Sequence, residues 1–378
     1  MSRSRDSAID WLKGISIIFV LLWHFQPIQI DYHVPKFSSE KVLGYAIYLI
    51  NNYVFCLAVP TFILISLYLF LSKIQKLNFI EAKKNLVDRS IRVFSLYFFY
   101  VSVQFSLFFV FQNFLRDFDV PAFNFPNQNV GLADISTLIV SNLFSGGPPL
   151  PIISYSVLYF LFDLAILTIL GFGFNQFFPP NSGSVKIISV VIITASILLF
   201  EASPLISNKI YAHQLENFIL YIPIAAFWVH DKNKFLSHRK IYLAGYIFFI
   251  LHDIFLERYN LRGEMYSRTS IVFGALAFIS FTYHYFSKNI LSLHPGIKFM
   301  SSHSLGIFAI HKYVMLSIVF LAEKIGNLTS LKLFWDYTIS IGDVRFKIII
   351  FILSTITIAL TVAIVSIIGK SKFKSLVM

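Results

Sequence analysis

Residues 348–368 read IIIFILSTITIALTVAIVSII, 21 consecutive positions without a charged side chain. About 20 apolar residues in an α-helix are enough to cross the hydrocarbon core of a bilayer. Hydrocarbon offers no partner for unpaired backbone groups, so a spanning segment of this kind is expected to be helical. The short alternating segments of an outer-membrane barrel are not seen in this run. The stretch therefore predicts a transmembrane helix.

Apolar runs of similar character recur along the whole chain, and we count about ten of them. The sequence thus predicts an all-α, polytopic bundle of transmembrane helices, with residues 1–378 forming a single domain. The fifth and sixth runs are the shortest. The predicted spans are Trp11–Ile28, Leu43–Leu71, Val93–Phe111, Ile152–Phe178, Ile187–Phe200, Phe218–His230, Ile241–Phe255, Thr269–Phe286, Leu305–Leu321 and Ile348–Ile368.

The composition agrees with a chain that has lipid as its solvent. Hydrophobic residues make up 57% of the sequence and charged residues only 13%, whereas soluble domains carry roughly a quarter charged residues. The net charge of +12 comes from short clusters between apolar runs, which is typical of membrane anchoring rather than nucleic-acid binding. Cys56 is the only cysteine, so neither an intrachain disulfide nor a thiolate metal site is expected.

The basic residues also predict the orientation. With the N-terminus inside, 19 of the 31 Lys and Arg residues fall in inner segments, and Lys312 falls within a span. Ten spans would return the C-terminus to the same side. The apolar stretch after Ser2–Arg5 resembles a signal peptide but lacks a small-x-small cleavage site, so we expect a retained helix. These features predict a multi-pass protein of the inner (plasma) membrane with both termini in the cytoplasm.

The longest outer connection, Gln112 to Pro151, is rich in Asn, Pro and Gly. Long loops in compact proteins usually have a function, so an ordered loop or a re-entrant cover is expected here.

Ionisable side chains at membrane depth are candidate functional residues, namely His24, Asp163, His252 with Asp253, His284 and His311. Asp253 and His284 lie near predicted helix ends, and adjacent residues such as His252 and Asp253 do not face each other on a helix, so His24, His311 and Asp163 are the main candidates. His24 lies 13 residues beyond Trp11, about 20 Å along a helix, and histidine suits proton transfer near neutral pH. The alternative for His24 is a hydrogen bond to a neighbouring helix. Asp163 could equally pair with an amide or a tyrosine.

A second candidate is the basic segment before the third span. Lys83 and Lys84 precede Arg89 and Arg92, which lie one turn apart on one helix face. This pattern fits membrane anchoring, and it also fits an anion site because guanidinium groups bind phosphate bidentately.

The N-terminal run, Arg5-x-x-x-Ile9-Asp10-Trp11-Leu12-Lys13-Gly14 and onward to His24, resembles the opening of acyltransferase family 3. Members of this family are integral-membrane O-acyltransferases, usually of about ten helices, that acylate bacterial surface glycans and related acceptors. The family places an arginine eleven positions before the histidine. Here the spacing is kept and Lys13 replaces the arginine.

Three further segments and one loose match resemble motifs of the family, and two of these segments carry a replacement at one motif position. The apolar segment Ala58–Ser66 is similar to one that ends in Ser-Gly, with Leu67 replacing glycine. Arg89-Ser-Ile-Arg92-Val-Phe-Ser95 resembles an Arg-x-x-Arg-x-x-Pro signature, with Ser95 replacing proline. Ser304–His311 resembles a late segment that ends in histidine, and Ser154–Ser156 loosely matches a tryptophan-led motif.

The resemblance implies an enzyme that uses acyl-CoA, in the first place acetyl-CoA, as a co-substrate, with no tightly bound cofactor and no metal. His24 and Asp10 are then the expected catalytic residues, with His24 as the general base towards a hydroxyl of a glycan or glycolipid. The phosphates of CoA would meet Arg89, Arg92 and Lys84. Lys13 would bind the donor or pair with Asp10, and His311 and Asp163 remain further candidates. Direct transfer and an acyl-histidine intermediate both stay open.

Two other functions fit a polytopic chain. A transporter or flippase of a lipid-linked glycan would explain the helices and buried polar groups, but such proteins often show two related halves, and the sequence has no such repeat. A membrane glycosyltransferase with a lipid-phosphate donor would need acidic residues in the first outer loop, where Asp31 and Glu40 are the candidates.

Overall fold

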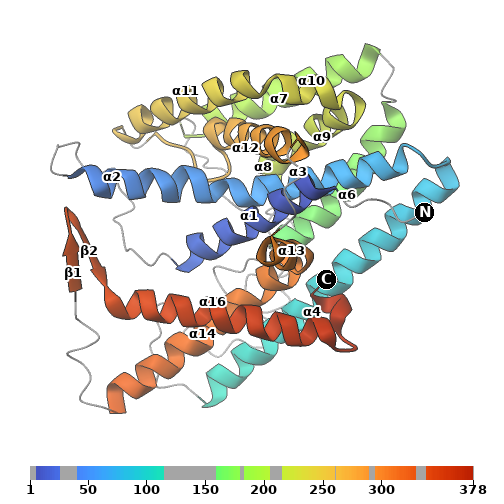
Figure 1. The fold of residues 1–378 in the computed structure, drawn as a ribbon. Helices are drawn as coiled ribbons and strands as arrows, with labels where there is room; N and C mark the ends of the chain where they lie inside the picture. The colour runs from blue at the N-terminus through green and yellow to red at the C-terminus, as the bar shows by residue number, and fades with distance from the viewer. Residues whose placement is uncertain are drawn as a thin grey trace. The chain divides into compact units, whose positions relative to one another are not determined.

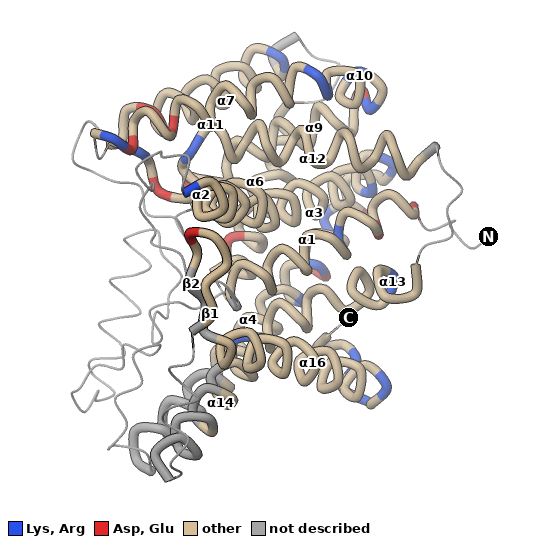
Figure 2. Tube along the Cα trace, turned by 60° about the vertical axis from the view of Figure 1, so that its left-hand side comes forward, with Lys and Arg blue, Asp and Glu red and all other residues tan. Residues whose placement is uncertain are grey.

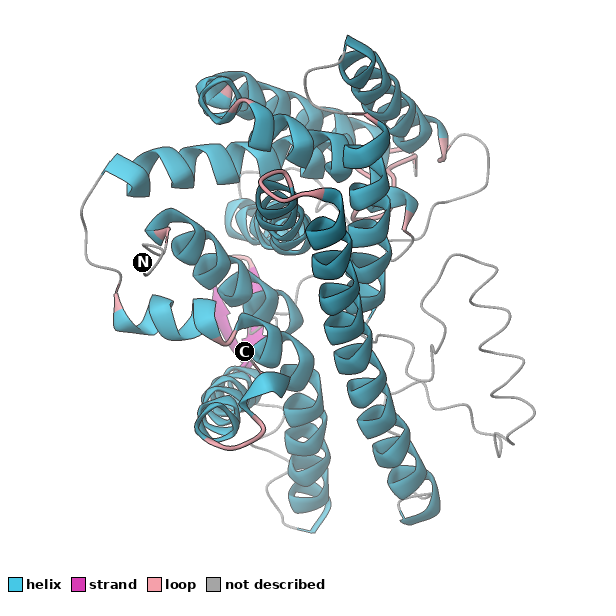
Figure 3. Ribbon diagram, turned by 90° about the vertical axis from the view of Figure 1, so that its right-hand side faces the viewer, coloured by secondary structure: helices cyan, strands magenta, loops and turns pink. Residues whose placement is uncertain are grey.

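In the computed structural model the chain divides into two compact units, which are treated separately below. Unit 1 comprises Met1–Phe62 and Asn233–Met378, and unit 2 comprises Ile63–Lys232. Helices dominate the described chain, which contains one pair of strands (Figure 3). The structure describes residues 6–25, 41–114, 159–178, 183–204, 215–259, 261–288, 294–328 and 338–377.

Unit 1 contains a continuous helical segment from residue 42 to the unit boundary, in which the middle turn is wider than an α-helix. The other helices of this unit are separate elements, and α10 and α3 each cross a unit boundary. The elements are α1 (Ser7–Phe25), α2 (Val42–Leu49), the π-helical turn η2 (Ile50–Val54), the 3-10 turn η3 (Phe55–Leu57), the start of α3 (Ala58–Ile74), α10 (Lys232–Ser237), α11 (Arg239–Glu257), α12 (Thr269–Lys288), α13 (Pro295–Ser302), α14 (Ser304–Leu328), β1 (Thr338–Ile341), β2 (Val344–Lys347), α16 (Ile348–Lys370) and the 3-10 turn η4 (Lys374–Leu376).

Helices α1 and α12 pack side by side and run antiparallel. The rings of Trp11 and Phe286 stack with centroids 4.2 Å apart, and those of Phe19 and Phe278 lie 5.5 Å apart. Moving eight residues forward on α1 therefore corresponds to moving eight residues backward on α12. This register places the C-terminal part of α1 near the first turn of α12.

The first turns of α1 and the last turns of α16 lie at the same end of unit 1. Gly14 touches α13, where an added Cβ would lie 2.7 Å from Ile297 Cγ2 and 3.0 Å from its carbonyl oxygen. Helix α14 follows α13 directly, and its start meets the end of α16 through His303 and Gly369. We call this end the terminal end. The cytoplasmic orientation of both termini stays a prediction.

A short hairpin precedes α16 and is the one departure from the all-α prediction in the described chain (Figure 1). Strand β1 pairs antiparallel with β2, with Ile341 opposite Val344. The two-residue turn has Gly342 at φ 58°, a conformation that glycine adopts at low cost. The Asp343 side chain accepts a hydrogen bond from the Gly44 backbone N–H at 3.0 Å, which ties the hairpin to α2.

Unit 2 is built around α4 and α6, which pack against each other, with α9 also against α6. Tyr68 of α3 stacks on Trp228 of α9 with ring centroids 4.0 Å apart. Gly171 of α6 lies against Leu67 and Leu71 of α3. The elements are the rest of α3, α4 (Phe79–Phe114), α6 (Tyr159–Phe177), α7 (Gly183–Ala202), α8 (Glu216–Ile219) and α9 (Tyr221–His230).

Six helical segments of the described chain are long and apolar enough to cross a membrane. Every predicted span coincides at least in part with a helix of the structure. The count of about ten spans remains a prediction. Figure 2 shows the basic positions at the C-terminal end of α16, with uncharged positions along its length. The six segments are Ser7–His24, Val42–Ile74, Tyr159–Phe177, Val185–Ala202, Thr269–Ser287 and Ile348–Lys370.

Candidate functional site

Two histidines predicted separately from the sequence meet in unit 1. His24 lies in the last turn of α1 and His311 lies in α14, and their ring centroids are 4.9 Å apart with the planes tilted by 40°. Helices α1 and α14 pack against each other. The structure therefore brings two ionisable rings from distant parts of the chain into contact.

The two rings differ in their surroundings. The side chain of His311 is completely buried, and its Nδ1 lies 3.0 Å from the carbonyl oxygen of Ile307 one turn earlier. A neutral ring that donates from Nδ1 to this carbonyl leaves Nε2 as an acceptor. His24 is only partly buried. His24 is thus the more accessible ring of the pair, and His311 is the one held by its own helix.

Asp10 and Lys13 lie towards the terminal end of unit 1, away from the histidine pair. The carboxylate of Asp10 accepts a hydrogen bond of 2.7 Å from the Ser301 hydroxyl of α13. Fourteen residues of α-helix, about 21 Å, separate Asp10 from His24. Asp10 therefore helps to hold α1 against α13, and its predicted catalytic role, like donor binding by Lys13, stays a prediction.

Arg89 is engaged by its neighbours within unit 2. One guanidinium nitrogen donates to the Ser66 hydroxyl at 2.6 Å and to the Ser66 carbonyl at 3.3 Å. Its Nε donates to the Thr168 hydroxyl at 3.3 Å, and the group lies over the Phe70 ring. Arg89 thus connects α4 to α3 and α6, and it joins two of the segments whose sequences resemble family motifs.

Arg92 and Lys84, the other predicted donor-binding residues, have exposed side chains on α4. An exposed cation can meet a phosphate without first breaking a buried contact. Within the basic segment, these two side chains are therefore better placed than Arg89 to reach a ligand.

Asp163 is completely buried in α6, and neither carboxylate oxygen has a hydrogen-bond partner in the described part of the chain. Tyr97 and Glu216 lie within electrostatic range. The amide or tyrosine partner considered from the sequence is thus not found among the described residues. No group of three His, Cys, Asp or Glu side chains suited to a metal occurs in that same part of the chain.

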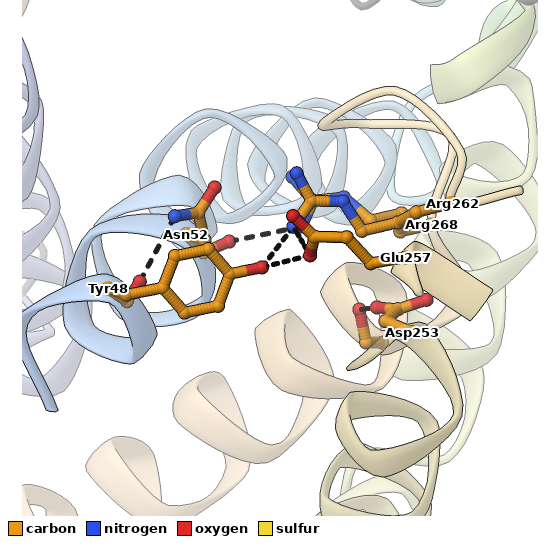
Figure 4. Close-up of polar contacts among 7 residues, drawn as sticks. Tyr48, Asn52, Asp253, Glu257, Arg262 and Arg268 are labelled. Carbon is orange, nitrogen blue, oxygen red and sulfur yellow. Dashed lines mark hydrogen bonds and ion pairs between the residues drawn. The ribbon is translucent and has the colours of Figure 1, made fainter. Parts of the chain in front are cut away.

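A polar network lies at the opposite end of unit 1 from the terminal end, where α2, the end of α11 and the start of α12 meet (Figure 4). Arg262 forms an ion pair with Glu257 at 2.6 Å, and both groups hydrogen-bond to the Tyr48 hydroxyl. Arg268 donates to the Asn52 carbonyl at 3.5 Å. Asp253 accepts a hydrogen bond from the Ser270 hydroxyl.

The π-helical turn η2 helps to build this network. It places Asn51, Asn52 and Tyr53 at buried positions, and π-bulges of this kind are frequent at functional sites. The wider turn alters the i→i−4 ladder, so the Asn52 carbonyl can accept from Arg268 and the Asn51 carbonyl from the Cys56 thiol.

Replacing Glu257 with alanine is expected to destabilise the protein. The change leaves Arg262 and the Tyr48 hydroxyl without this carboxylate in a mostly buried position, at a cost of about 2–4 kcal/mol. Thermal unfolding of detergent-purified protein measures the effect. Glu264→Ala, which removes an exposed carboxylate from the same segment, is the matched control and should shift the midpoint little.

This network was not predicted from the sequence, although Asp253 was among the ionisable candidates. Arg262 and Arg268 were counted only as basic residues outside the predicted inner segments, and Tyr48, Asn52 and Glu257 had no motif around them. The sequence does place arginines close to two predicted spans. Arg258 and Arg262 follow the predicted seventh span, and Arg268 directly precedes the predicted eighth. Hydropathy identifies such residues as charges in a loop between spans. It does not show that the loop packs against another helix.

The fold and site define a helical membrane protein with a histidine pair at the end of its first apolar helix. Residues 6–369 match the sequence model of acyltransferase family 3, described as an acyltransferase domain, and the chain belongs to this family. The match covers nearly the whole chain and confirms the resemblance drawn from the motifs. Neither the curated proteins nor the solved structures contain a significant match.

Proposed function

We propose that this membrane acyltransferase moves an acyl group, in the first place acetyl, from cytosolic acyl-CoA to a hydroxyl of a cell-surface or lipid-linked glycan. The contact between His24 and His311 supports the proposal most directly, since a histidine at membrane depth is suited to proton transfer. We further propose that the protein lies in the inner (plasma) membrane, where cytosolic acyl-CoA is within reach of one face.

In the proposed reaction, His24 removes the proton from the acceptor hydroxyl. The oxygen attacks the carbonyl carbon of the thioester, a C–O bond forms, and the C–S bond breaks. The proton then passes from His24 to the departing thiolate, so free CoA and the O-acyl ester are the products. An acyl-histidine route would instead transfer the acyl group to the ring first.

His311 has a positioning role in this proposal. A ring that donates from Nδ1 to the Ile307 carbonyl presents an acceptor at Nε2 and can hold the neighbouring His24 ring in one orientation. Fixing the ring orientation of a general base lowers the entropic cost of reaching the reactive geometry. His24 is thus the residue that meets the reacting hydroxyl.

The donor phosphates are assigned to the exposed side of α4. CoA is polyanionic, and Arg92 and Lys84 offer exposed positive charges about two turns apart on α4. Arg89 supports this helix through Ser66 and Thr168 and acts as a positioning residue. We keep Lys13 as a further candidate for donor binding.

Membranes that contain the protein, incubated with radiolabelled acetyl-CoA and a candidate glycan, test the proposal. We expect label to enter the glycan as an alkali-labile ester, and free CoA to form in equal amount. Glycan movement across the membrane without acetyl-CoA consumption would contradict the proposal and support the flippase alternative. Label transfer by membranes from cells that lack the protein would show a different enzyme at work.

A further inference from the structure

Arg268 is a buried cation whose hydrogen-bonding capacity is mostly unused. Its side chain is 4% exposed, directly before the first residue of α12. Its one hydrogen bond in the described chain is the 3.5 Å contact to the Asn52 carbonyl, and its Nε has no partner there. A guanidinium group carries five N–H donors, so most of its donors have no acceptor in the described chain.

The Asp253 carboxylate does not pair with this cation in the described chain. Asp253 lies within electrostatic range of Arg268, but no ion pair joins the two side chains in the described structure. The Asp253 carboxylate instead accepts a hydrogen bond from the Ser270 hydroxyl in the first turn of α12. The buried Nε–H of Arg268 has no acceptor in the described chain, and leaving a charged donor unsatisfied is costly, so an oxygen from outside the described chain would stabilise this position.

Tyr53 connects Arg268 to a second arginine. The Arg268 guanidinium lies over the Tyr53 ring at 5.4 Å from its centroid. The buried Tyr53 hydroxyl lies near Arg262 without a hydrogen bond of normal geometry. Arg262 is anchored by Glu257 and Tyr48. Two guanidinium groups and one hydroxyl donor thus gather beside the positive end of a helix, an arrangement that suits an oxyanion.

The antiparallel register of α1 and α12 relates this cluster to His24. Phe19 meets Phe278, and five residues further along α1 is His24, which corresponds to Phe273 on α12. Arg268 lies five residues from Phe273, so His24 and Arg268 are offset by about 8 Å along the helix axes.

We propose that Arg268, Arg262 and the Tyr53 hydroxyl bind an anionic oxygen group, phosphate or carboxylate, that the acceptor glycan carries close to its reacting hydroxyl. This inference rests on the proposed function and specifies its acceptor class. The anion occupies the unused donors of Arg268, and its position directs a nearby hydroxyl towards His24.

Paired acceptors separate the two sources of the anion. One pair is a glycan with a uronic acid and the same glycan after carboxyl reduction. The other is a lipid-diphosphate-linked glycan and the same glycan released from its lipid diphosphate. In one of the two pairs, we expect kcat/KM for the anionic member to exceed that of its neutral counterpart by about 10- to 100-fold, as for a charge-assisted hydrogen bond. Equal kcat/KM values in both pairs would overturn the inference.

Three substitutions assign the selectivity to the cluster. Arg268→Gln should remove most of the preference for the anionic acceptor, and Arg268→Lys should restore part of it. Tyr53→Phe should weaken the preference several-fold. A purely structural role predicts no effect of Tyr53→Phe, because the hydroxyl makes no hydrogen bond in the described chain. Arg258→Gln removes an exposed charge from the same segment and is the matched control with unchanged preference.

A binding measurement keeps this inference separate from the proposed function. The anionic glycan should raise the unfolding temperature of the detergent-purified wild type, and should raise that of Tyr53→Phe by less. If acyl transfer is absent while this stabilisation is seen, the proposed function fails and the anion site stands. If the two proteins respond equally, the anion site fails even where acyl transfer occurs. Tyr53→Phe should retain the fold, so the comparison holds if Arg268→Gln does not fold.

Discussion

Replacing His24 with alanine should abolish acyl transfer in membranes while the protein is still made and inserted. The expected loss is about 10²- to 10⁴-fold, which is the usual contribution of a general base. The partly buried ring lies against His311 in the last turn of α1, so its removal takes away a reactive group with little packing. Initial rates with saturating acetyl-CoA, normalised to protein abundance, measure the effect.

A second histidine provides the control for this prediction. His284 on α12 is also partly buried in an apolar helix, and His284→Ala should retain most of the activity. His311→Ala should lower kcat more than it changes KM for either substrate, because we propose that this ring orients the base. Full activity of His24→Ala would remove the mechanism, whatever the result with His311.

The structure pairs segments that the sequence motifs singled out separately. The segment that ends at His24 and the segment that ends at His311 meet in unit 1 through the two rings. The segment that ends at Ser66 and the Arg-x-x-Arg segment meet in unit 2 through Arg89. A single sequence carries no information on which helices touch, so these contacts could only come from the structure.

The fold was predictable where hydropathy dominates. Long apolar runs such as Ile348–Ile368 gave helices at the expected positions, because lipid leaves the backbone no alternative. The hairpin at Thr338–Lys347 and the π-helical turn Ile50–Val54 were not predicted, since each depends on a local turn or on packing. The predicted outer cover, Gln112–Pro151, lies almost entirely outside the described residues, and only its start falls in α4.

Arg268 shows why the polar network could not be predicted from the sequence. Between two predicted spans, a basic residue is normally read as a solvated loop charge. Its burial depends on the π-helical turn and on Tyr53, and neither feature has a sequence period of its own. The different roles of Arg89 and Arg92 could not be predicted for a similar reason. Their spacing places both arginines on one helix face, but it does not show that Arg89 is hydrogen-bonded to Ser66 and Thr168.

Arg92→Ala should strongly reduce transfer at acyl-CoA concentrations near the wild-type KM, without unfolding the protein. Arg92 is exposed on α4, and losing one charge-assisted contact to a donor phosphate should raise KM for acyl-CoA by about 10- to 100-fold. Acyl-CoA titrations measure KM and kcat, and thermal unfolding reports stability. The unfolding midpoint should stay close to that of the wild type, because surface substitutions usually change stability little.

Arg89→Ala is the matched comparison and should behave in the opposite way. It removes the hydrogen bonds to Ser66 and Thr168 that connect α4 to α3 and α6, so stability should fall by about 2–4 kcal/mol. Lys84→Ala, also exposed, should resemble Arg92→Ala with a smaller rise in KM, because ammonium binds phosphate as a point charge. If Arg92→Ala keeps the wild-type KM while Arg89→Ala raises it at unchanged stability, the donor phosphates meet Arg89 and our assignment of the two arginines is wrong.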